Sequence, residues 1–276
     1  METWRLLPWS TGTADAELAL AHGLLAGLDS VGQQPIEQPR PALRWYGMSP
    51  PALIIGSGQS LEQIDQLACQ RAGIQIYRRS SGGSAVLATP DMLMCDLVLP
   101  RHHRLWLADV TESYRWFSDI WVATLIRLGV PARSISIAEA RSDTQHQDQW
   151  SRRVCFAGRS PYEIMTGERK VIGLSQVRRR SGLLIQAGLY LHWHAAAISR
   201  LLNIPISEQM IMIERLDQRV TGIHDLGPAD VQHTDIMAAF TTALNQHFGM
   251  TLEPADWSPT EQEAQHQAHA RYAPIR

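Results

Sequence analysis

The chain has 276 residues, of which 45% are hydrophobic and 19% charged. This composition supplies enough apolar material for a sizeable core and excludes a disordered tail or linker. The formal net charge of -2 argues against a general nucleic-acid binder and against a protein held on an anionic membrane. Three cysteines are too few for a disulfide framework, and no signal peptide or apolar run of about 18 residues is visible. We therefore expect a cytoplasmic protein without membrane segments.

The first half of the chain alternates one helix with several short strands. A helix rich in alanine and leucine is predicted from Thr13 to Leu28. Residues 60–73 have helical spacing, with Ser60 and Gln63 as a capping box and Gly73 as the stop. Strand-sized apolar runs bounded by Gly, Pro and Ser lie at 44–48, 52–56, 74–79, 85–89 and 92–100.

The second half begins with a predicted helix at 109–128 and a polar loop at 141–149. Closely spaced strands joined by short glycine turns follow, which indicates antiparallel pairing; they lie at 154–158, 162–165, 169–178 and 183–191. Further helices are predicted near Ile198 and at 234–248. This order favours an α+β fold, a mixed, largely antiparallel sheet flanked by helices. We expect one domain over residues 1–250, with a peripheral helix and tail at 251–276.

Lysine occurs once, at Lys170, although lysine and arginine together number 25. Codon bias against lysine and chance could leave one lysine anywhere on the surface. Alternatively, the site needs a compact, rotatable ammonium that the planar guanidinium cannot replace. Both interpretations stay open from composition alone.

Cys155 is the cysteine whose neighbours favour chemistry. Cys69 lies in a predicted helix and Cys95 in an apolar strand, so both are expected to be inert core residues. Positive charge favours the reactive thiolate form of a cysteine. Several positively charged residues lie within fifteen positions of Cys155, including Arg152, Arg153, Arg159, Arg169 and Lys170. Glu163 and Glu168 are the negatively charged residues weighed against them.

The segment Arg78–Val86 combines two adjacent arginines with a glycine pair. Arginines bind phosphate or carboxylate in a bidentate manner, and glycines let a backbone approach a ligand. An ordinary glycine turn with two surface arginines is the alternative. The segment is not a P-loop, because no Gly-Lys-Ser/Thr sequence follows. No metal site is expected, since His192, His194 and the pair His102–His103 lack partners at zinc-like spacing.

Four segments occur in an order that resembles the lipoate–protein ligase A and octanoyltransferase family: RRSSGGSAV, CFAGRSPYEI, GERKVIGLSQVRRR and LLIQAG. The resemblance implies a fold similar to the catalytic domain of biotin protein ligases and class II aminoacyl-tRNA synthetases. It also implies that Cys155 is a nucleophile and that Lys170 contacts the acyl carbonyl or an activated phosphate. The implied acyl-binding residues are Arg78, Arg79, Ser81, Gly82, Gly83, Ser84, Ala85, Gly173, Ser175 and Gln176.

Within that family, CFAGRSPYEI is similar to the branch that uses a cysteine. The resemblance then implies transfer of an octanoyl or lipoyl group from a carrier thioester, through an acyl-Cys155 enzyme, to a lysine of a lipoyl domain. No cofactor is needed for this reaction. Two alternatives remain: a ligase that uses ATP and magnesium to form lipoyl-AMP, and a non-catalytic binder of acylated lipoyl domains.

The implied acceptors are lipoyl domains of 2-oxoacid dehydrogenases or the glycine cleavage H protein. The donor is acyl carrier protein or the acylated H protein, and the sequence does not choose between them. We expect a monomer with no nucleic-acid or membrane partner.

Overall fold

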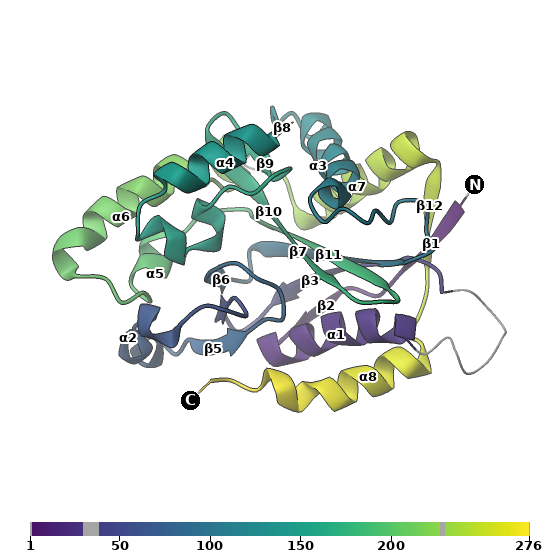
Figure 1. Ribbon diagram of the computed structural model, residues 1–276, viewed down its shortest axis with the longest axis horizontal. Helices are drawn as coiled ribbons and strands as arrows, with labels where there is room; N and C mark the ends of the chain where they lie inside the picture. Colours follow the sequence, from purple (N-terminus) through teal and green to yellow (C-terminus); the bar gives the residue numbers. More distant parts are fainter. Residues whose placement is uncertain (1, 30–38, 227–229, 276) are drawn as a thin grey trace.

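The computed structural model describes residues 2–29, 39–226 and 230–275. A nine-stranded sheet runs through the centre of the molecule (Figure 1). Its strands follow the order β12 (Met250–Pro254), β1 (Glu2–Leu6), β3 (Ala42–Met48), β7 (Met92–Pro100), β11 (Gly182–Tyr190), β10 (Arg169–Arg178), β9 (Ile164–Thr166) and β8 (Arg133–Ser134), with β2 (Ser10–Gly12) beside β3. A smaller sheet has the order β5 (Gln75–Arg78), β4 (Ala52–Ile55) and β6 (Val86–Ala88).

The pairing confirms a mixed, largely antiparallel sheet flanked by helices. Strands β3, β7, β11, β10, β9 and β8 are antiparallel in succession. Strand β1 pairs in parallel with β12 and β3, and β4 pairs in parallel with β5. Strand β11 is therefore central, and its apolar residues are buried on both faces.

Helices cover both faces of the large sheet. On one face, α1 (Ala14–Gly27) packs its leucines against Val98 and Leu184, and α8 (Pro259–His269) lies along α1 (Figure 1). On the other face, α3 (Arg115–Arg127) and α7 (His233–Phe248) bury an aromatic cluster against Trp45. Since neighbouring strand residues point to opposite faces, Leu97 joins the α3–α7 side while Val98 joins the α1 side.

A buried ion network joins α1 to the sheet. The Arg44 guanidinium on β3 is fully buried and donates to Glu17 at 2.7 Å and to Asp96 at 2.8 Å. Asp96 also accepts a hydrogen bond of 2.7 Å from the Gln186 amide on β11. Buried charges of this kind are stable only when paired, so the network fixes the position of α1 over the sheet.

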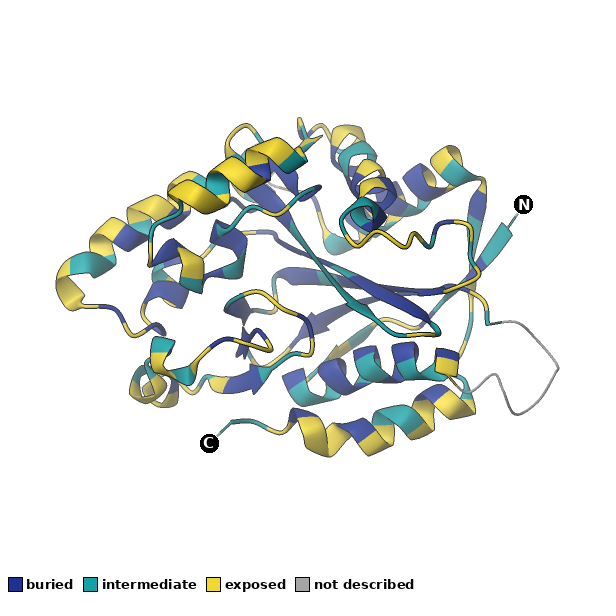
Figure 2. Cartoon of the chain, viewed as in Figure 1, coloured by how far each residue is buried: buried dark blue, intermediate teal, exposed yellow. Residues whose placement is uncertain are grey.

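The remaining helices lie mostly at the end of the molecule where the small sheet lies (Figure 1). They are α2 (Gln66–Arg71), α4 (Ile137–His146), α5 (Ala195–Ser199) and α6 (Ile206–Arg219). Figure 2 shows that α4 and α6 expose one whole face. Within the described ranges, no helix is long and apolar enough to cross a membrane.

Four predicted elements differ from the structure. The helix expected at 109–128 begins only at Arg115, as α3, after the 3₁₀ turn η3 (Glu112–Tyr114). The loop expected at 141–149 is mostly helix α4, because Ser136 and Glu139 form a capping box and Ala140 packs in a small buried cluster. The strand expected at 154–158 is a single bridge followed by a 3₁₀ turn, η5 (Cys155–Ala157). The helix expected at 60–73 is divided, since Asp65 caps a new helix, α2, after the short turn η2 (Leu61–Gln63).

Residues 251–276, expected as a peripheral helix and tail, also contribute to the large sheet and to the layer of helices that covers it. They contain most of β12, which extends the large sheet beside β1, and α8, which covers α1. The turn η7 (Ala270–Tyr272) follows, and the buried Tyr272 hydroxyl lies 3.2 Å from both Ser80 Oγ and His22 Nδ1. The C-terminal segment therefore reaches the loop that follows β5.

Candidate active site

Cys155 opens a short turn that we call the cysteine loop, residues 155–159. Val154 forms a single bridge with Ala85, and the Cys155 amide donates to the Ala85 carbonyl at 2.9 Å. This contact joins the loop to the start of β6. The chain then turns away in η5, so the Cys155 side chain stays half-buried. The thiol thus lies beside the glycine-containing segment that the sequence singled out.

Arg79 connects that glycine segment to the thiol. Its Nη2 donates to the carbonyls of Gly82 at 2.8 Å and Ser84 at 3.0 Å, and lies 3.7 Å from Cys155 Sγ. A positive charge at this distance stabilises negative charge on the sulfur. Gly83 has a φ of 92°, and a Cβ there would lie 3.2 Å from Sγ and 2.7 Å from Arg79 Nη2. Only glycine fits this contact without strain.

The thiol borders an apolar cavity of about 70 Å³ between α1, the small sheet and strands β10 and β11. We call it the thiol cavity. Its apolar wall comes from Leu18, Met48, Ile54, Val86, Met92 and Met94, with Phe156 beside Cys155. Besides the thiol, its polar side chains are those of Tyr46, Arg79, Ser175 and Gln186. Among the described residues that line it, none is Asp, Glu or His, so the cavity suits an aliphatic chain with a reactive group at the thiol.

Two glycines paired across β10 and β11 form the floor of the thiol cavity beneath Phe156. Gly173 and Gly188 are register partners, and a Cβ on Gly173 would lie 3.3 Å from the Phe156 ring. A Cβ on Gly188 would lie 2.6 Å from the Met92 methyl and 3.3 Å from Met94 Sδ. The missing side chains therefore leave room for the aromatic ring and the two methionines.

Lys170 is almost fully buried behind the cysteine loop. Its ammonium donates to the Cys155 carbonyl at 2.9 Å, to the Glu163 carboxylate at 2.9 Å and to the Gly158 carbonyl. Glu163 is itself buried and accepts from the Ser160 amide at 2.7 Å. The three N–H bonds of the ammonium all have protein acceptors, so in this arrangement Lys170 holds the backbone of the loop that carries the thiol.

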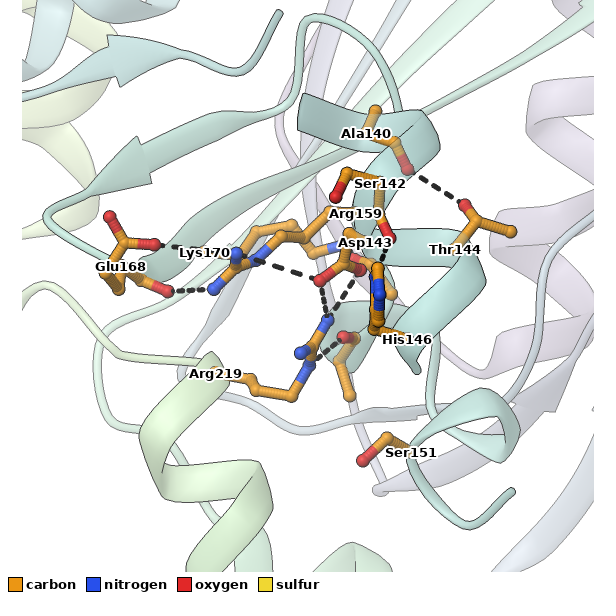
Figure 3. A network of polar contacts seen from close by, with 12 residues as sticks. Ala140, Ser142, Asp143, Thr144, His146, Ser151, Arg159, Glu168, Lys170 and Arg219 are labelled. Carbon is orange, nitrogen blue, oxygen red and sulfur yellow. Dashed lines mark hydrogen bonds and ion pairs between the residues drawn. The ribbon is translucent and has the colours of Figure 1, made fainter. Parts of the chain in front are cut away.

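A second cation holds the outer side of the cysteine loop (Figure 3). Arg219, at the end of α6, donates to the Ala157 carbonyl at 2.6 Å and to both carboxylate oxygens of Asp143 at 2.6 Å. Figure 3 shows Arg159 facing the same Asp143. Its Nη1 lies 3.7 Å from Asp143 Oδ1. Helix α4, which the sequence did not predict, therefore supplies the carboxylate that orients Arg219 and Arg159.

The other predicted site residues divide into two groups. Gly82, Gly83, Ser84 and Ala85 lie along the segment that contacts Arg79 and Cys155, and Gly173 and Ser175 line the thiol cavity. Arg78, Ser81 and Gln176 do not line the thiol cavity. Arg78 donates to the carbonyls of Gly56, Ser57 and Gln59, the Ser81 side chain is buried, and Gln176 donates to the Val110 carbonyl.

Sequence reasoning missed the residues that shape the cavity: Leu18, Met48, Met92, Met94, Phe156, Gln186 and Gly188. Most are apolar residues of ordinary strands and helices, and nothing in their spacing separates them from the core. Phe156 alone had a usable signal, because it directly follows Cys155 in the sequence. Arg219 and Asp143 were also missed.

Comparison with known families identifies the family of this chain. Residues 17–245 match the model of the lipoyl protein ligase A/B catalytic domain. The chain belongs to this family. The match covers every element that builds the thiol cavity, from Leu18 on α1 to Gly188 on β11.

Among curated relatives of this lipoyl ligase-family chain, the octanoyltransferase LipM of Kyrpidia tusciae is 29% identical over 277 residues, covering 99% of this chain and 97% of the relative. The octanoyltransferase LipM of Symbiobacterium thermophilum is 30% identical, covering 99% and 97%. The similarity therefore spans essentially both full lengths.

Solved structures show the same fold. A bipartite lipoate protein ligase from Thermoplasma acidophilum, solved in a study with its E2 lipoyl domain, superposes with a TM-score of 0.77 at 19% identity, covering 98% of this chain and 93% of that one. A lipoate-protein ligase A bound with ATP gives a TM-score of 0.74 at 22% identity, covering 98% and 95%. The expected lipoate–protein ligase fold is confirmed.

Proposed function

We propose that this protein transfers an octanoyl group from a carrier thioester to a lysine of a lipoyl domain, through an acyl-enzyme on Cys155. The observation that carries the proposal is a half-buried thiol, 3.7 Å from the Arg79 guanidinium, at an apolar cavity. Full-length similarity to octanoyltransferases supports it. Nucleophilic cysteines need a cation or base close to the sulfur, and Arg79 supplies the cation.

In the first step, the Cys155 sulfur attacks the thioester carbonyl carbon. A carbon–sulfur bond forms to Cys155, the bond to the donor sulfur breaks, and the donor leaves as a free thiol with the proton that Cys155 gives up. Arg79 faces the same cavity and places positive charge where the carbonyl oxygen becomes negative. Lys170 and Arg219 act as positioning residues, because they hold the carbonyls of the loop that carries the sulfur.

In the second step, the neutral amine of the acceptor lysine attacks the acyl-Cys155 carbonyl. An amide forms, and the released thiol takes the amine proton. A lysine amine has an ordinary pKa of about 10.4, so its deprotonation at neutral pH costs roughly 4–5 kcal/mol. The described lining residues offer no carboxylate or imidazole for this proton. We therefore propose that the ammonium proton, lost before the amine attacks, passes to solvent or to the acceptor domain.

The thiol cavity does not fit a magnesium–nucleotide complex. Magnesium is held through carboxylates and phosphate oxygens, and the described cavity lining offers no carboxylate. The solved lipoate-protein ligase A that binds ATP has the same fold. A shared fold does not make ATP a substrate of this protein.

Three mixtures test the function. The first combines the protein with an apo lipoyl domain and an octanoyl carrier thioester, the second replaces the thioester by octanoic acid with ATP and magnesium, and the third omits the acyl source. Intact-protein mass spectrometry follows both proteins. We expect one octanoyl unit on the lipoyl domain in the first mixture alone. Modification only in the second would make the protein a ligase, and none in either would make it a binder.

Gly188 is expected to set the preferred chain length of the acyl group. In Gly188→Ala, the new methyl group displaces the Met92 methyl group into the thiol cavity, because the two would otherwise lie 2.6 Å apart. Methionine adapts easily, so the fold should survive. One methylene in an apolar pocket changes specificity about 10-fold or more. We expect the ratio of kcat/KM for octanoyl over hexanoyl thioester to fall about tenfold.

The matched control for this change is Gly58→Ala, since a Cβ at Gly58 would meet nothing within 4 Å. Its chain-length profile should equal that of the wild type. An unchanged profile in Gly188→Ala would show that the acyl chain does not reach this part of the cavity.

A further inference from the structure

The C-terminal turn η7 contacts the loop that carries Arg79. We call residues 79–84 the arginine loop. The Ser80 hydroxyl of this loop lies 3.2 Å from the Tyr272 hydroxyl on η7. Just beyond η7, the Ile275 amide donates to the Ile76 carbonyl on β5 at 2.8 Å, so the C-terminal segment runs beside the small sheet (Figure 1). One segment therefore contacts both β5 and the loop that follows it.

The Tyr272 hydroxyl is held from two sides. The Tyr272 ring is buried in the core beside α1, and its hydroxyl lies 3.2 Å from Ser80 Oγ and 3.2 Å from His22 Nδ1. A phenolic hydroxyl can donate one hydrogen bond and accept another. Both capacities are used here, which fixes the hydroxyl between α1 and the arginine loop.

His22 determines the direction of these hydrogen bonds. Arg179 Nη2 lies 3.2 Å from His22 Nε2, and a guanidinium can only donate, so Nε2 is the acceptor and a neutral ring carries its proton on Nδ1. Burial lowers the pKa of His22, and two neighbouring arginines lower it further against a smaller effect of Asp29, which favours the neutral ring. Nδ1 then donates to the Tyr272 oxygen, and the Tyr272 hydroxyl donates to Ser80 Oγ.

The arginine loop needs such a contact because glycines give it little rigidity. Gly82 and Gly83 are adjacent and exposed, and glycine backbones adopt many conformations. The Arg79 guanidinium is held by carbonyls of this same loop, at Gly82 and Ser84. A shift of the loop would therefore shift the guanidinium and lengthen its contact with the Cys155 sulfur.

Two hydrogen bonds from other segments reach the middle of the arginine loop. The Ser57 amide donates to the Ser81 carbonyl at 3.0 Å, and Tyr272 donates to the Ser80 side chain. The first contact fixes the backbone from the side of β4, and the second fixes the loop from the side of η7. Loss of the second leaves Ser80, directly next to Arg79, without its side-chain contact to the core.

We propose that the Tyr272 hydroxyl positions the arginine loop and thereby holds the Arg79 guanidinium at the Cys155 sulfur. The proposal rests on the proposed function, in which Cys155 is the nucleophile. Tyr272 does not line the thiol cavity, so it acts through Arg79 as a positioning residue. The C-terminal segment thus contributes to the reaction as well as to the fold.

Two variants remove the two ends of the same hydrogen bond: Tyr272→Phe and Ser80→Ala. Intact-protein mass spectrometry follows acylation of Cys155 by an octanoyl thioester and its alkylation by iodoacetamide. Both reactions need the thiolate, which a nearby cation favours. Each variant should lower both rates about threefold to tenfold, the range of one net hydrogen bond. The double variant should be no slower than either single one. Unchanged rates in either single variant would overturn the proposal.

A double-mutant cycle tests the link to Arg79. Arg79→Gln should lower acylation about a hundredfold, and Tyr272→Phe added to it should have no further effect, because no guanidinium is left to position. Independent effects would multiply, so a further fall of threefold to tenfold would overturn the proposal. The comparison of Tyr272→Phe with Ser80→Ala does not depend on the folding of Arg79→Gln, since Ser80 is exposed.

Tyr77→Phe is the matched control. Tyr77 is a buried tyrosine on β5, and its hydroxyl donates to the Gln75 side chain, outside the arginine loop. This variant also loses one tyrosine hydroxyl and one hydrogen bond. Both rates should equal those of the wild type, which separates the loss of a hydroxyl near the small sheet from the loss of the contact with Ser80.

Alkylation separates this proposal from the proposed function, because it needs no acyl donor. If no thioester acylates the wild type but alkylation falls in Tyr272→Phe and Ser80→Ala, the proposed function fails and the positioning role stands. If the wild type is acylated and neither rate changes in the two variants, the positioning role fails alone.

Discussion

Replacing Cys155 by alanine should reduce octanoyl transfer by about a thousandfold or more, because the acyl-enzyme can no longer form. The side chain is half-buried, and within the described residues its sulfur accepts one hydrogen bond, from Arg79 at 3.7 Å. Its truncation should therefore leave the melting temperature within a few degrees of the wild type. Intact mass measured after mixing with octanoyl thioester should show the octanoyl adduct on the wild type and none on Cys155→Ala.

The other two cysteines provide the matched control. Burial raises the pKa of Cys69 to about 11 and that of Cys95 well above its ordinary value, with neighbouring carboxylates acting in the same direction. At pH 8 both should remain protonated and unreactive. Iodoacetamide should therefore add one group to the native wild type and none to Cys155→Ala. Cys69→Ala should keep full transfer activity.

Two results would contradict this assignment. Transfer from a thioester that persists in Cys155→Ala would exclude a covalent intermediate on this sulfur. Modification that persists in the variant and requires ATP would place the protein with the ligases, whose activation step needs no cysteine.

The sheet could be predicted from the sequence, and Cys155 could be singled out as the candidate nucleophile, because each has a local signal. Apolar runs of strand length bounded by glycine and proline identified β3, β4, β5, β7, β10 and β11. Cys155 was separated from Cys69 and Cys95 by its cationic neighbours alone. These signals depend on residues that are adjacent in the chain.

The shape of the site depends on register, which the sequence does not show. Gly173 and Gly188 become partners only when β10 and β11 pair, and Met92 reaches Gly188 only through the pairing of β7 with β11. Gln176 could have been assigned correctly. It directly follows Ser175 on a strand, so the alternation of side chains places it on the opposite face, where it contacts Val110.

The expected contact of Lys170 with the acyl carbonyl stays a prediction, and the structure adds a second role. Its compact ammonium fits among the carbonyls of Cys155 and Gly158 and the Glu163 carboxylate. Arginine has a larger, planar head that cannot direct three donors at these acceptors from the same buried position. This geometry explains how one lysine could persist in a chain that otherwise uses arginine.

Replacing Lys170 by methionine should destabilise the fold by about 3–5 kcal/mol, because it leaves the buried Glu163 carboxylate without its cation. Acylation of Cys155 should fall about a hundredfold at a temperature where the variant is folded, since small displacements of a nucleophile cost this much. Lys170→Arg should not restore the rate. Urea unfolding and the rate of octanoyl-adduct formation measure the two effects.

A comparison of two reactions of Cys155 distinguishes positioning from direct catalysis by Lys170. Acylation passes through a negatively charged oxygen, whereas alkylation by iodoacetamide displaces iodide and forms no such oxygen. If Lys170 holds the cysteine loop, both rates should fall in Lys170→Met. If its ammonium stabilises the oxyanion, acylation should fall while alkylation stays unchanged, and the positioning role would be wrong.

Arg5→Met provides a matched control for the loss of stability, because Arg5 pairs with Glu261 at 2.7 Å on the α8 side of the molecule. It should lower the free energy of unfolding without changing either rate.

In Lys170→Met, the added change Glu163→Gln removes the unpaired buried charge. We expect this double variant to recover part of the stability but none of the acylation, since two loop carbonyls still lack their ammonium donor. Recovery of acylation together with stability would show that Lys170 matters to the reaction only through folding.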